Sequence, residues 1–542
     1  MRFSQVRNFI AVRIDYCSEE RVDMFATAKT SCIVGLDAVP VQVEVSMKEG
    51  DKKFSILGLG GTAVRESRER IVSALEMSGL DVPPVILVNL APAEVRKDSA
   101  CFDLPIALAL ACAIGALPQE ALLNVSACGE LSLSGEVKHT TGIAAHALSA
   151  VKQDIPMILV PDEDGVEAAV VEGVTVIGVR SLAQAIRVLK GAEVPEPKTR
   201  REAVTLRRVK TLDDVLGQHV AKRALTIAAA GGHNLLMIGP PGCGKSMLAE
   251  RLPTLLPPLN TDDMLEVLRI HSVAGQATDD VLAGVRPVRT PHYVVSDAGL
   301  IGGGAGPRPG EVSLAHHGVL FLDEFPEFRR SAVEALRSPM ETGWVQIARA
   351  KASVNFPARF QLIAAMNPCP CGRFGSGVGV CRCSHHAVRD YLAKLSQPIL
   401  DRIDLHVELE AVNVDDLIWA KAPITQGSDV LIASVLAARE RQILRQGVLN
   451  SQLADGALRA GVKITDGARM LLTQAISKIG ISARGFTRVL RVAATIADLS
   501  GQDSITEDVV AEAVSYRSLD RLASIIHGRG VIAREPHSAG IR

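Results

Sequence analysis

The sequence predicts a multidomain α/β protein, and three observations lead to this fold class. Strand-like and helical stretches alternate through residues 24–190. A glycine-rich sequence at 239–246 lies between an apolar run and a helical pattern. Two later apolar runs end in polar side chains, which is typical of strands whose carboxyl ends meet at a binding site. The 542 residues leave room for roughly three or four domains.

The overall composition limits the classes of function. The formal net charge is −1, so the total charge gives no case for nucleic acid, although it allows a local basic surface. Two Trp and four Tyr are too few for a wide platform that stacks single-stranded bases. No run of about 18 apolar residues lacks charges, so we expect no membrane span.

The first 23 residues differ from the rest of the chain. They carry interspersed charges and no apolar core, which is unlike a signal peptide. Met24 opens a more strand-like stretch. We therefore interpret residues 1–23 as a leader produced by a misplaced gene start, with Met24 as the true first residue.

Residues 24–190 are expected to form one α/β domain. Runs rich in β-branched residues predict strands at Val41–Val45, Phe54–Leu57 and Val85–Asn89. Apolar residues with a helical period predict helices at 64–78 and 103–116. A last strand and helix follow at 175–190, where Ser181 is the expected N-cap of the helix.

The remainder of the chain is expected to contain a linker, a nucleotide domain, a helical segment and a tail. Residues 191–210 are rich in proline and charge and have no apolar period, which is typical of a linker. The nucleotide domain is expected at 211–412 and the helical segment at 413–521. Residues 522–542 have the glycine-rich composition of a frayed end.

The most specific motif is Asn-Leu-Leu-Met-Ile-Gly-Pro-Pro-Gly-Cys-Gly-Lys-Ser at 234–246. It fits G-x-x-x-x-G-K-[ST] in the strand–loop–helix context that this motif requires. Lys245 is expected to reach the β- and γ-phosphates of ATP, and Ser246 to ligate Mg²⁺. The rest of the predicted phosphate loop consists of Gly239, Pro240, Pro241, Gly242, Cys243 and Gly244.

A phosphate-binding loop of this kind indicates the cytoplasm. In that reducing compartment, we expect no disulfides among the six scattered cysteines.

Two later strands end in the polar residues that hydrolysis needs. Val319–Glu324 is an apolar run that ends in two carboxylates. Asp323 is expected to hold Mg²⁺ through water, and Glu324 to orient or deprotonate the attacking water. The run 360–367 ends in Asn367, whose amide is suited to position the same water.

This order of motifs resembles an AAA+ ATPase. More specifically, the sequence is similar to the magnesium-chelatase-related family called YifB or ComM, from about Met24 to Arg521. The motifs that carry the resemblance are Leu212-Asp-Asp-Val-Leu-Gly-Gln218, Gly-Gly-His-Asn-Leu-Leu-Met-Ile-Gly at 231–239, Ala364-Ala-Met-Asn-Pro-Cys-Pro-Cys-Gly372 and Asp401-Arg-Ile-Asp-Leu-His406.

The resemblance implies a fold and an activity. The implied architecture is an N-terminal Lon-protease-like α/β domain, an AAA+ α/β core with a P-loop, and a C-terminal helical lid. The implied activity is that of a homo-hexameric ring ATPase acting on DNA, without a membrane. ComM members are branch-migration helicases that act when incoming DNA is integrated during natural transformation.

Two arginines gain a role from the resemblance. Arg402 is at the position of an arginine finger, which would reach the γ-phosphate bound to the neighbouring subunit. Arg484 is at the position of the sensor-2 arginine of the lid, and Arg488, one helical turn on, is the competing choice. For Arg402 and Arg484 the alternative is an ordinary solvated charge.

The stretch 343–356 predicts two short strands around a basic turn. In this branch of AAA+ proteins, a hairpin just before the Asn strand points into the pore of the ring. Arg349 and Lys351 are then candidates for contacts to DNA phosphates, which position DNA without reading its sequence. An exposed hairpin with ordinary charges is the alternative.

Four cysteines, Cys369, Cys371, Cys381 and Cys383, lie within fifteen residues. Four thiolates can close a tetrahedral structural zinc site. Their C-x-C spacing departs from the usual C-x₂-C, and His385 or His386 is an alternative ligand. Reduced thiols without a metal, and a redox or iron–sulfur role, remain the other interpretations.

The N-terminal domain resembles Lon-type proteases at Lys97-Asp-Ser-Ala-Cys-Phe-Asp103. A Lon-type site needs a Ser nucleophile and a Lys base. In this sequence, Cys101 falls at the nucleophile position and Ala144 at the position of the base. We therefore expect no peptidase activity, and a role for this domain in assembly or DNA contact.

Two functions remain compatible with these motifs. The first is a DNA-stimulated hexameric motor for branch migration or unwinding. The second is a chelatase-type or remodelling ATPase that acts on a protein or a metal-insertion partner. The basic hairpin and the attached N-terminal domain favour the first function.

Overall fold

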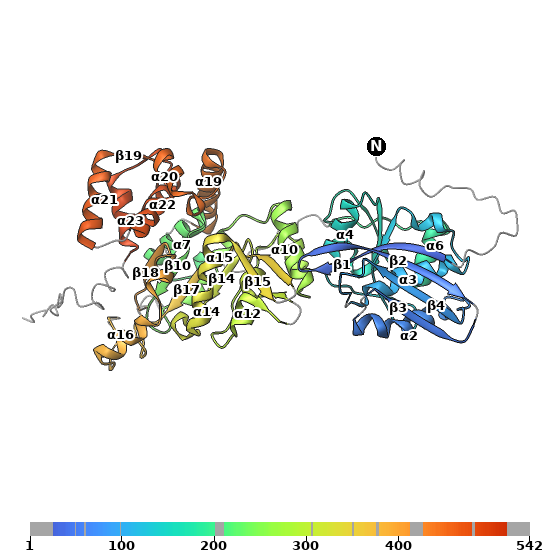
Figure 1. Cartoon of the computed structure of the whole chain (residues 1–542). Helices are drawn as coiled ribbons and strands as arrows, with labels where there is room; N and C mark the ends of the chain where they lie inside the picture. Colours follow the sequence, from blue (N-terminus) through green and yellow to red (C-terminus); the bar gives the residue numbers. More distant parts are fainter. Residues whose placement is uncertain are drawn as a thin grey trace, which may run out of the picture. The chain divides into compact units, whose positions relative to one another are not determined.

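The computed structural model shows an α/β chain that divides into two compact units (Figure 1). Residues 1–204 and 260–285 form the first unit, and residues 205–259 and 286–542 form the second. The expected leader, the expected tail and half of the expected linker lie outside the described residues. The structure describes residues 25–48, 50–58, 61–97, 99–200, 211–304, 307–349, 352–375, 379–411, 427–479 and 483–517.

A seven-stranded mixed sheet forms the centre of the first unit, in the order β3-β4-β2-β1-β5-β8-β9. Along β2, the side chains of the second half alternate between buried and less buried positions, as expected for a strand that packs on one face. The three strands predicted from β-branched runs all lie in this sheet. The strands of the unit are β1 (Phe25–Val34), β2 (Asp37–Lys48), β3 (Lys53–Leu57), β4 (Val85–Ala91), β5 (Val125–Ala127), β6 (Glu130–Leu131), β7 (Val137–Lys138), β8 (Met157–Pro161) and β9 (Thr175–Val179).

The helices of the first unit cover this sheet. In α3 every residue is buried, which explains why its sequence is apolar on all sides. Helix α6 begins where predicted, because the Ser181 hydroxyl accepts a hydrogen bond from the backbone N–H of Gln184 at 3.2 Å. The helices are α2 (Thr62–Met77), α3 (Asp103–Ala113), α4 (Ile143–Lys152), α5 (Gly165–Ala168), α6 (Leu182–Leu189), α10 (Thr261–Val273) and α11 (Asp279–Leu282).

Residues 260–285 come from the middle of the expected nucleotide domain, yet they belong to the first unit. Leu265 of α10 packs against the core of this unit. The backbone N–H of Gly142 donates to Ser272 Oγ at 2.8 Å, and Arg269 pairs with Asp37 at 2.7 Å. The sequence analysis placed these residues in the nucleotide domain, and no local pattern indicated that they would join the core of the first unit.

The second unit is built on five parallel strands in the order β11-β14-β17-β10-β18. Strands β10, β14 and β17 are buried along their whole length, as expected in a parallel sheet. Residues that follow the strands share one side of the sheet, here called the carboxyl edge; residues that precede them share the amino edge. The strands are β10 (Leu235–Ile238), β11 (Val288–Arg289), β14 (Val319–Leu322), β17 (Gln361–Met366) and β18 (Leu405–Glu408).

Helices and two small antiparallel pairs complete the nucleotide core. The hairpin predicted at 343–356 is present and follows directly from α15. Its strands are β15 (Trp344–Arg349) and β16 (Ala352–Pro357), and a second pair is β12 (Gly302–Gly303) and β13 (Arg308–Pro309). The helices are α7 (His219–Gly231), α8 (Lys245–Ala249), α9 (Leu252–Leu255), α12 (Asp297–Ile301), α13 (Glu311–Leu314), α14 (Arg330–Ala335), α15 (Arg337–Thr342), α16 (His385–Ala393) and α17 (Gln397–Leu400).

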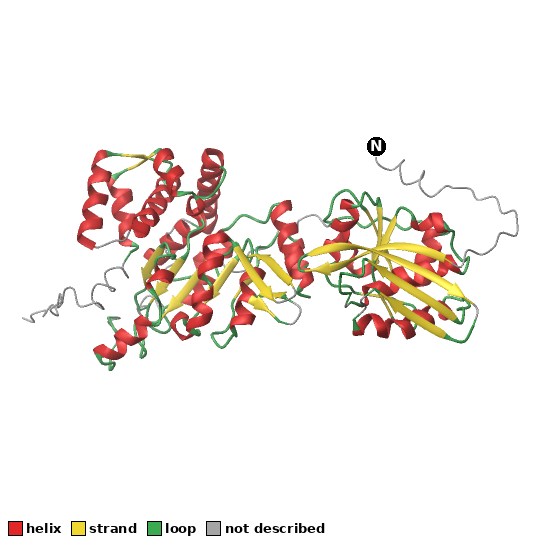
Figure 2. Ribbon diagram, in the orientation of Figure 1, coloured by secondary structure: helices red, strands yellow, loops and turns green. Residues whose placement is uncertain are grey.

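The C-terminal part is helical, as Figure 2 shows. Its apolar residues join those of α7, β10 and β18 in one hydrophobic core. No pattern in the sequence predicted the two-residue strands that pair within it. The elements are α19 (Ser428–Gln446), α20 (Asp455–Gly461), β19 (Lys463–Ile464), α21 (Asp466–Ile479), α22 (Ala483–Leu499), β20 (Ser504–Ile505) and α23 (Glu507–Ser515).

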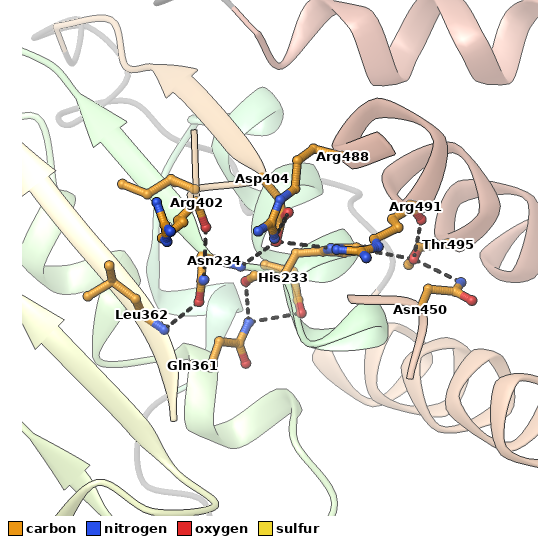
Figure 3. A network of polar contacts seen from close by, with 12 residues as sticks. His233, Asn234, Gln361, Leu362, Arg402, Asp404, Asn450, Arg488, Arg491 and Thr495 are labelled. Atoms are coloured by element: carbon orange, nitrogen blue, oxygen red, sulfur yellow. Dashed lines mark hydrogen bonds and ion pairs between the residues drawn. The ribbon is translucent and has the colours of Figure 1, made fainter. Parts of the chain in front are cut away.

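A polar network at the amino edge joins the sheet to the helical part (Figure 3). The carboxylate of Asp404, just before β18, is fully buried and accepts from the backbone N–H of Asn234 at 3.1 Å. Arg488 of α22 donates to it at 2.8 Å, and His233 Nδ1 lies 3.3 Å away. Burial opposes ionisation of Asp404, but the charge of Arg488 and the contact with His233 hold its pKa well below the usual range.

Substitution of Arg488 by Met is expected to destabilise the second unit by about 3–5 kcal/mol near pH 7, because Asp404 is left as a buried charge without its cation. The deficit should shrink as the pH falls towards 4, because protonation of Asp404 removes the unpaired charge. Denaturant unfolding at several pH values measures both effects. Arg484→Met, at an exposed position of the same helix, is the control; a pH-independent deficit would contradict the role given to Asp404.

Candidate active site

The predicted phosphate loop connects β10 to α8 at the carboxyl edge. Gly242 and Gly244 have φ angles of +79° and +92°, which residues with a Cβ rarely adopt. Lys245 Nζ donates to the carbonyl oxygens of Gly239 and Pro240 at 2.7 and 2.9 Å, so the ammonium group folds back over the loop. Burial lowers the pKa of Lys245.

Three adjacent strands bring the predicted catalytic residues together. Ser246 Oγ, after β10, donates to Asp323 Oδ2, after β14, at 2.7 Å. Lys245 Nζ also donates to Asn367 Oδ1, after β17, at 3.2 Å. The hydroxyl and carboxylate oxygens form a hard oxygen pair of the type that Mg²⁺ prefers, beside a cationic side chain.

Glu324 has an unusual backbone conformation. Its φ of 52° lies in the left-handed region, which a residue with a side chain seldom occupies. Its N–H donates to Asp323 Oδ1 at 2.9 Å, and its carbonyl accepts from Glu327 N at 2.7 Å. These bonds hold the side chain of Glu324 exposed at the carboxyl edge, next to Asp323.

Arg402 lies on the opposite side of the sheet. It precedes β18, whereas Gly239 follows β10, and the two strands are parallel with Leu235 opposite Leu405. A four-residue strand spans about 13 Å, so Arg402 is far from the phosphate loop of its own chain. Its side chain is 7% exposed, donates to Pro398 O at 2.6 Å and pairs with Glu341.

A cavity of about 130 Å³ contains Arg402 together with Arg484, Arg488 and Arg491. Arg484 and Arg488, the two candidates for the sensor-2 position of the lid, lie in different environments. Arg488 pairs with the buried Asp404, whereas Arg484 is exposed and also lines this cavity. The two predicted nucleotide-sensing arginines, Arg402 and Arg484, therefore share one cavity near the amino edge.

The predicted DNA-contacting residues lie at the hairpin. Arg349 is the last residue of β15 and pairs with Ala352 across the turn. Lys351 lies outside the described residues, so its predicted contact has no structural counterpart here.

The four clustered cysteines have their sulfur atoms close together, within 4.8 Å of one another. Cys369 Sγ lies 3.4 Å from Cys371 Sγ and 3.7 Å from Cys381 Sγ. A tetrahedral site with Zn–S bonds of about 2.3 Å requires sulfur separations of about 3.8 Å, so the four thiols fit a zinc ion. His386 instead pairs with Asp390 at 2.7 Å.

The backbone favours a thiolate in this cluster. Backbone N–H groups of Arg382 and Arg373 lower the pKa of Cys371 to about 6. Although the N–H of Cys383 favours its thiolate, partial burial and the thiol of Cys371 raise the pKa of Cys381 to about 12. Neighbouring thiolates repel each other, and a bound cation would stabilise all of them by offsetting this repulsion.

The Lon-like loop of the first unit lacks the properties of a nucleophilic site. Cys101 is 2% exposed, and burial raises the pKa of its thiol to about 12. Ala144 is buried in α4 and offers no base. A separate cavity of about 350 Å³ lies between α5 and α10–α11 and contains none of the predicted site residues.

Sequence reasoning missed several residues that shape the site. Gln218 Nε2 donates to Cys243 O at 3.2 Å and to Glu410 O at 2.8 Å, and so ties the phosphate loop to the chain after β18. Glu341 forms an ion pair with Arg402. At the amino edge, Asp404 accepts a hydrogen bond from the backbone N–H of Asn234. Gln218 and Asp404 lie in stretches that carried the family resemblance, but only three-dimensional contacts reveal their partners.

The fold and these contacts define a P-loop ATPase of the AAA class that is related to magnesium chelatase. Family profiles agree in three successive blocks. "Subunit ChlI of Mg-chelatase" matches residues 43–164, "Magnesium chelatase, subunit ChlI" matches 211–417, and "Magnesium chelatase, subunit ChlI C-terminal" matches 425–517.

Similar proteins narrow the class to a family. "Uncharacterized protein YifB" of Escherichia coli is 40% identical over 499 residues, which cover 92% of this chain and 97% of that protein. "Competence protein ComM" of Haemophilus influenzae is 38% identical over 501 residues, covering 90% and 96%. The chloroplastic magnesium-chelatase subunit ChlI of Oryza sativa subsp. indica is 24% identical over 347 residues, covering 59% and 77%. The chain belongs to the YifB/ComM family of magnesium-chelatase-related proteins.

Replacing Glu324 by Gln is expected to leave ATP binding intact and to slow hydrolysis by about 10²–10⁴-fold, because a general base is lost. Phosphate release and binding of a fluorescent nucleotide separate the two effects. The control is Glu327→Gln, since Glu327 is three residues on and makes a surface pair with Lys394 at 3.0 Å. Equal losses in both variants would argue against a base at Glu324.

Proposed function

We propose that this chain is the subunit of a homo-hexameric ATP-driven motor that acts on DNA. Its activity would be branch migration or helicase action during the integration of DNA taken up in natural transformation. The observation that carries this proposal is the similarity to a competence protein along 96% of the length of that relative. The basic hairpin at β15–β16, which includes Arg349, supports it.

Within each site, the roles are divided among the residues described above. Lys245 and the phosphate loop would bind the phosphates of ATP, and Ser246 and Asp323 would hold Mg²⁺, which neutralises phosphate charge when bound. Glu324 would take a proton from the attacking water, and Asn367 would orient that water. The four clustered cysteines would hold a structural zinc ion.

The position of the arginines supports the proposed assembly. Arg402 and Arg484 lie near the amino edge and Lys245 at the carboxyl edge, so one chain cannot bring them to the same phosphate. In a ring with repeated head-to-tail contacts, the amino edge of one subunit can face the carboxyl edge of the next. Arg402 would then act as the finger on the ATP of its neighbour, with Arg484 beside it.

No helix among the described residues has both the length and the apolar character needed to cross a bilayer. A cytoplasmic location and the absence of a membrane partner remain predictions.

A second candidate function rests on the three chelatase profiles that match in succession. It is a chelatase-type or remodelling ATPase whose partner is a protein or a metal-insertion complex. The two functions share the ATP site and differ only in the partner that stimulates turnover.

Two inactive variants are expected to restore activity to each other if the active site is shared. Lys245→Ala should lose nucleotide binding, and Arg402→Ala should lose about 10³–10⁵ in turnover. Mixed rings contain sites with an intact Lys245 next to an intact Arg402, and these should hydrolyse ATP. Phosphate release at several mixing ratios measures this; rings that form but remain inactive at every ratio would contradict the shared site.

DNA should stimulate ATP hydrolysis, because a motor couples turnover to contact with its track. Turnover is measured at low salt without DNA and with forked, three-stranded and plain duplex DNA. Stimulation that weakens with rising salt is expected, since phosphate contacts release counterions. No stimulation and no binding by any of these DNAs would favour the chelatase-type function. Arg349→Ala should reduce DNA affinity without changing basal turnover.

A further inference from the structure

The cysteine cluster begins where the catalytic strand β17 ends. Asn367 follows this strand, and Cys369 is only two residues further along the chain. The side chain of Asn367 accepts the hydrogen bond from Lys245 at 3.2 Å, while Cys369 is fully buried. Any force that fixes Cys369 therefore also restrains Asn367 beside the phosphate loop.

A second contact joins the cluster to the phosphate loop. Gly372 directly follows Cys371 and has a φ of +75°. A Cβ built on Gly372 would lie 2.5 Å from Cδ of Pro241 and 3.8 Å from Cγ of Asn367. The backbone at Gly372 thus packs directly on the phosphate loop, at a distance that only glycine permits.

The described residues around the cysteines form an irregular segment. The described residues from 367 to 384 contain no helix and no strand. In the turn, Gly372 N donates to Cys369 O at 2.9 Å and Phe374 N donates to Cys369 Sγ at 3.4 Å. Cross-linking a segment of this kind through four thiolates removes much of its conformational freedom, so a metal would decide its position.

We propose that the four cysteines form a zinc site that sets the affinity of the phosphate loop for nucleotide. The metal holds Gly372 against Pro241 and Asn367 beside Lys245. The inference rests on the proposed ATP site at 239–246. It assigns Gly372 and the four cysteines as positioning residues, since none of them needs to touch the nucleotide.

Binding of a fluorescent ADP analogue to the full-length protein, with Mg²⁺ present, tests this proposal. The wild type should carry about one equivalent of zinc, and Cys381→Ser with Cys383→Ser should carry less than half of an equivalent. The same double variant should bind ADP about 5- to 150-fold more weakly, which is the usual range of coupling between two sites. These two cysteines are distant from Gly372 in the sequence, so their replacement leaves the residues next to Gly372 unchanged.

Two further variants separate positioning from a general loss of structure. Gly372→Ala keeps all four thiols and should retain zinc, yet it should bind ADP more weakly because the new Cβ displaces Pro241. Arg382→Ala changes an exposed residue between Cys381 and Cys383 and should keep both zinc and ADP affinity. Thermal unfolding of each variant, and addition of Zn²⁺ alone to chelator-treated wild type, verify that the fold persists.

Reciprocity supplies an independent measurement. If zinc strengthens ADP binding by a given factor, ADP must strengthen zinc binding by the same factor. Competition for zinc with a coloured chelator should therefore show higher zinc affinity when ADP is present, and no such gain in Lys245→Ala.

The outcomes distinguish this inference from the proposed function. Equal ADP affinity with and without zinc, an unaffected Gly372→Ala variant, or a wild type with less than half an equivalent of zinc would each overturn the inference alone. Failure of the zinc-loaded wild type to bind ADP at all would overturn the proposed ATP site together with it.

Discussion

A single buried charge, the carboxylate of Asp404, fixes the geometry of the second unit. The backbone of Asn234 before β10 and the side chain of Arg488 in the helical lid both bond to it, so β10, β18 and the lid meet at this carboxylate. An ionised carboxylate cannot remain buried without such partners, and the partners cannot move apart without exposing it. The position of Arg402, two residues earlier, and the approach of the lid to the sheet both depend on this interaction.

The parallel sheet then separates two kinds of chemistry. The carboxyl edge holds a lysine, a hydroxyl and two carboxylates around a glycine loop, and the amino edge holds a cluster of arginines. One edge suits the binding of a phosphate chain with its cation, and the other suits the neutralisation of charge that develops during transfer. If the active site is shared as proposed, a lone subunit would bind nucleotide but would lack the complete set of groups for rapid hydrolysis.

The sequence was informative wherever the relevant signal is local. The phosphate loop, the strand ends at Asp323 and Asn367, and the hairpin at 343–356 are short patterns whose meaning depends on residues close by in the chain. Contacts between distant segments left no such trace. Glu341 beside Arg402, Gly372 against Pro241 and the attachment of residues 260–285 to the first unit all depend on packing that single-sequence patterns do not encode.

The attachment of residues 260–285 to the first unit has a topological consequence. The chain passes from one unit to the other near residues 204, 259 and 285, so the units are joined by three covalent crossings. A protease that cuts only the segment at 191–210 would leave α10 packed against the first unit, so the two fragments would stay associated. Neither unit can therefore be removed by a single cut without exposing the apolar side of α10.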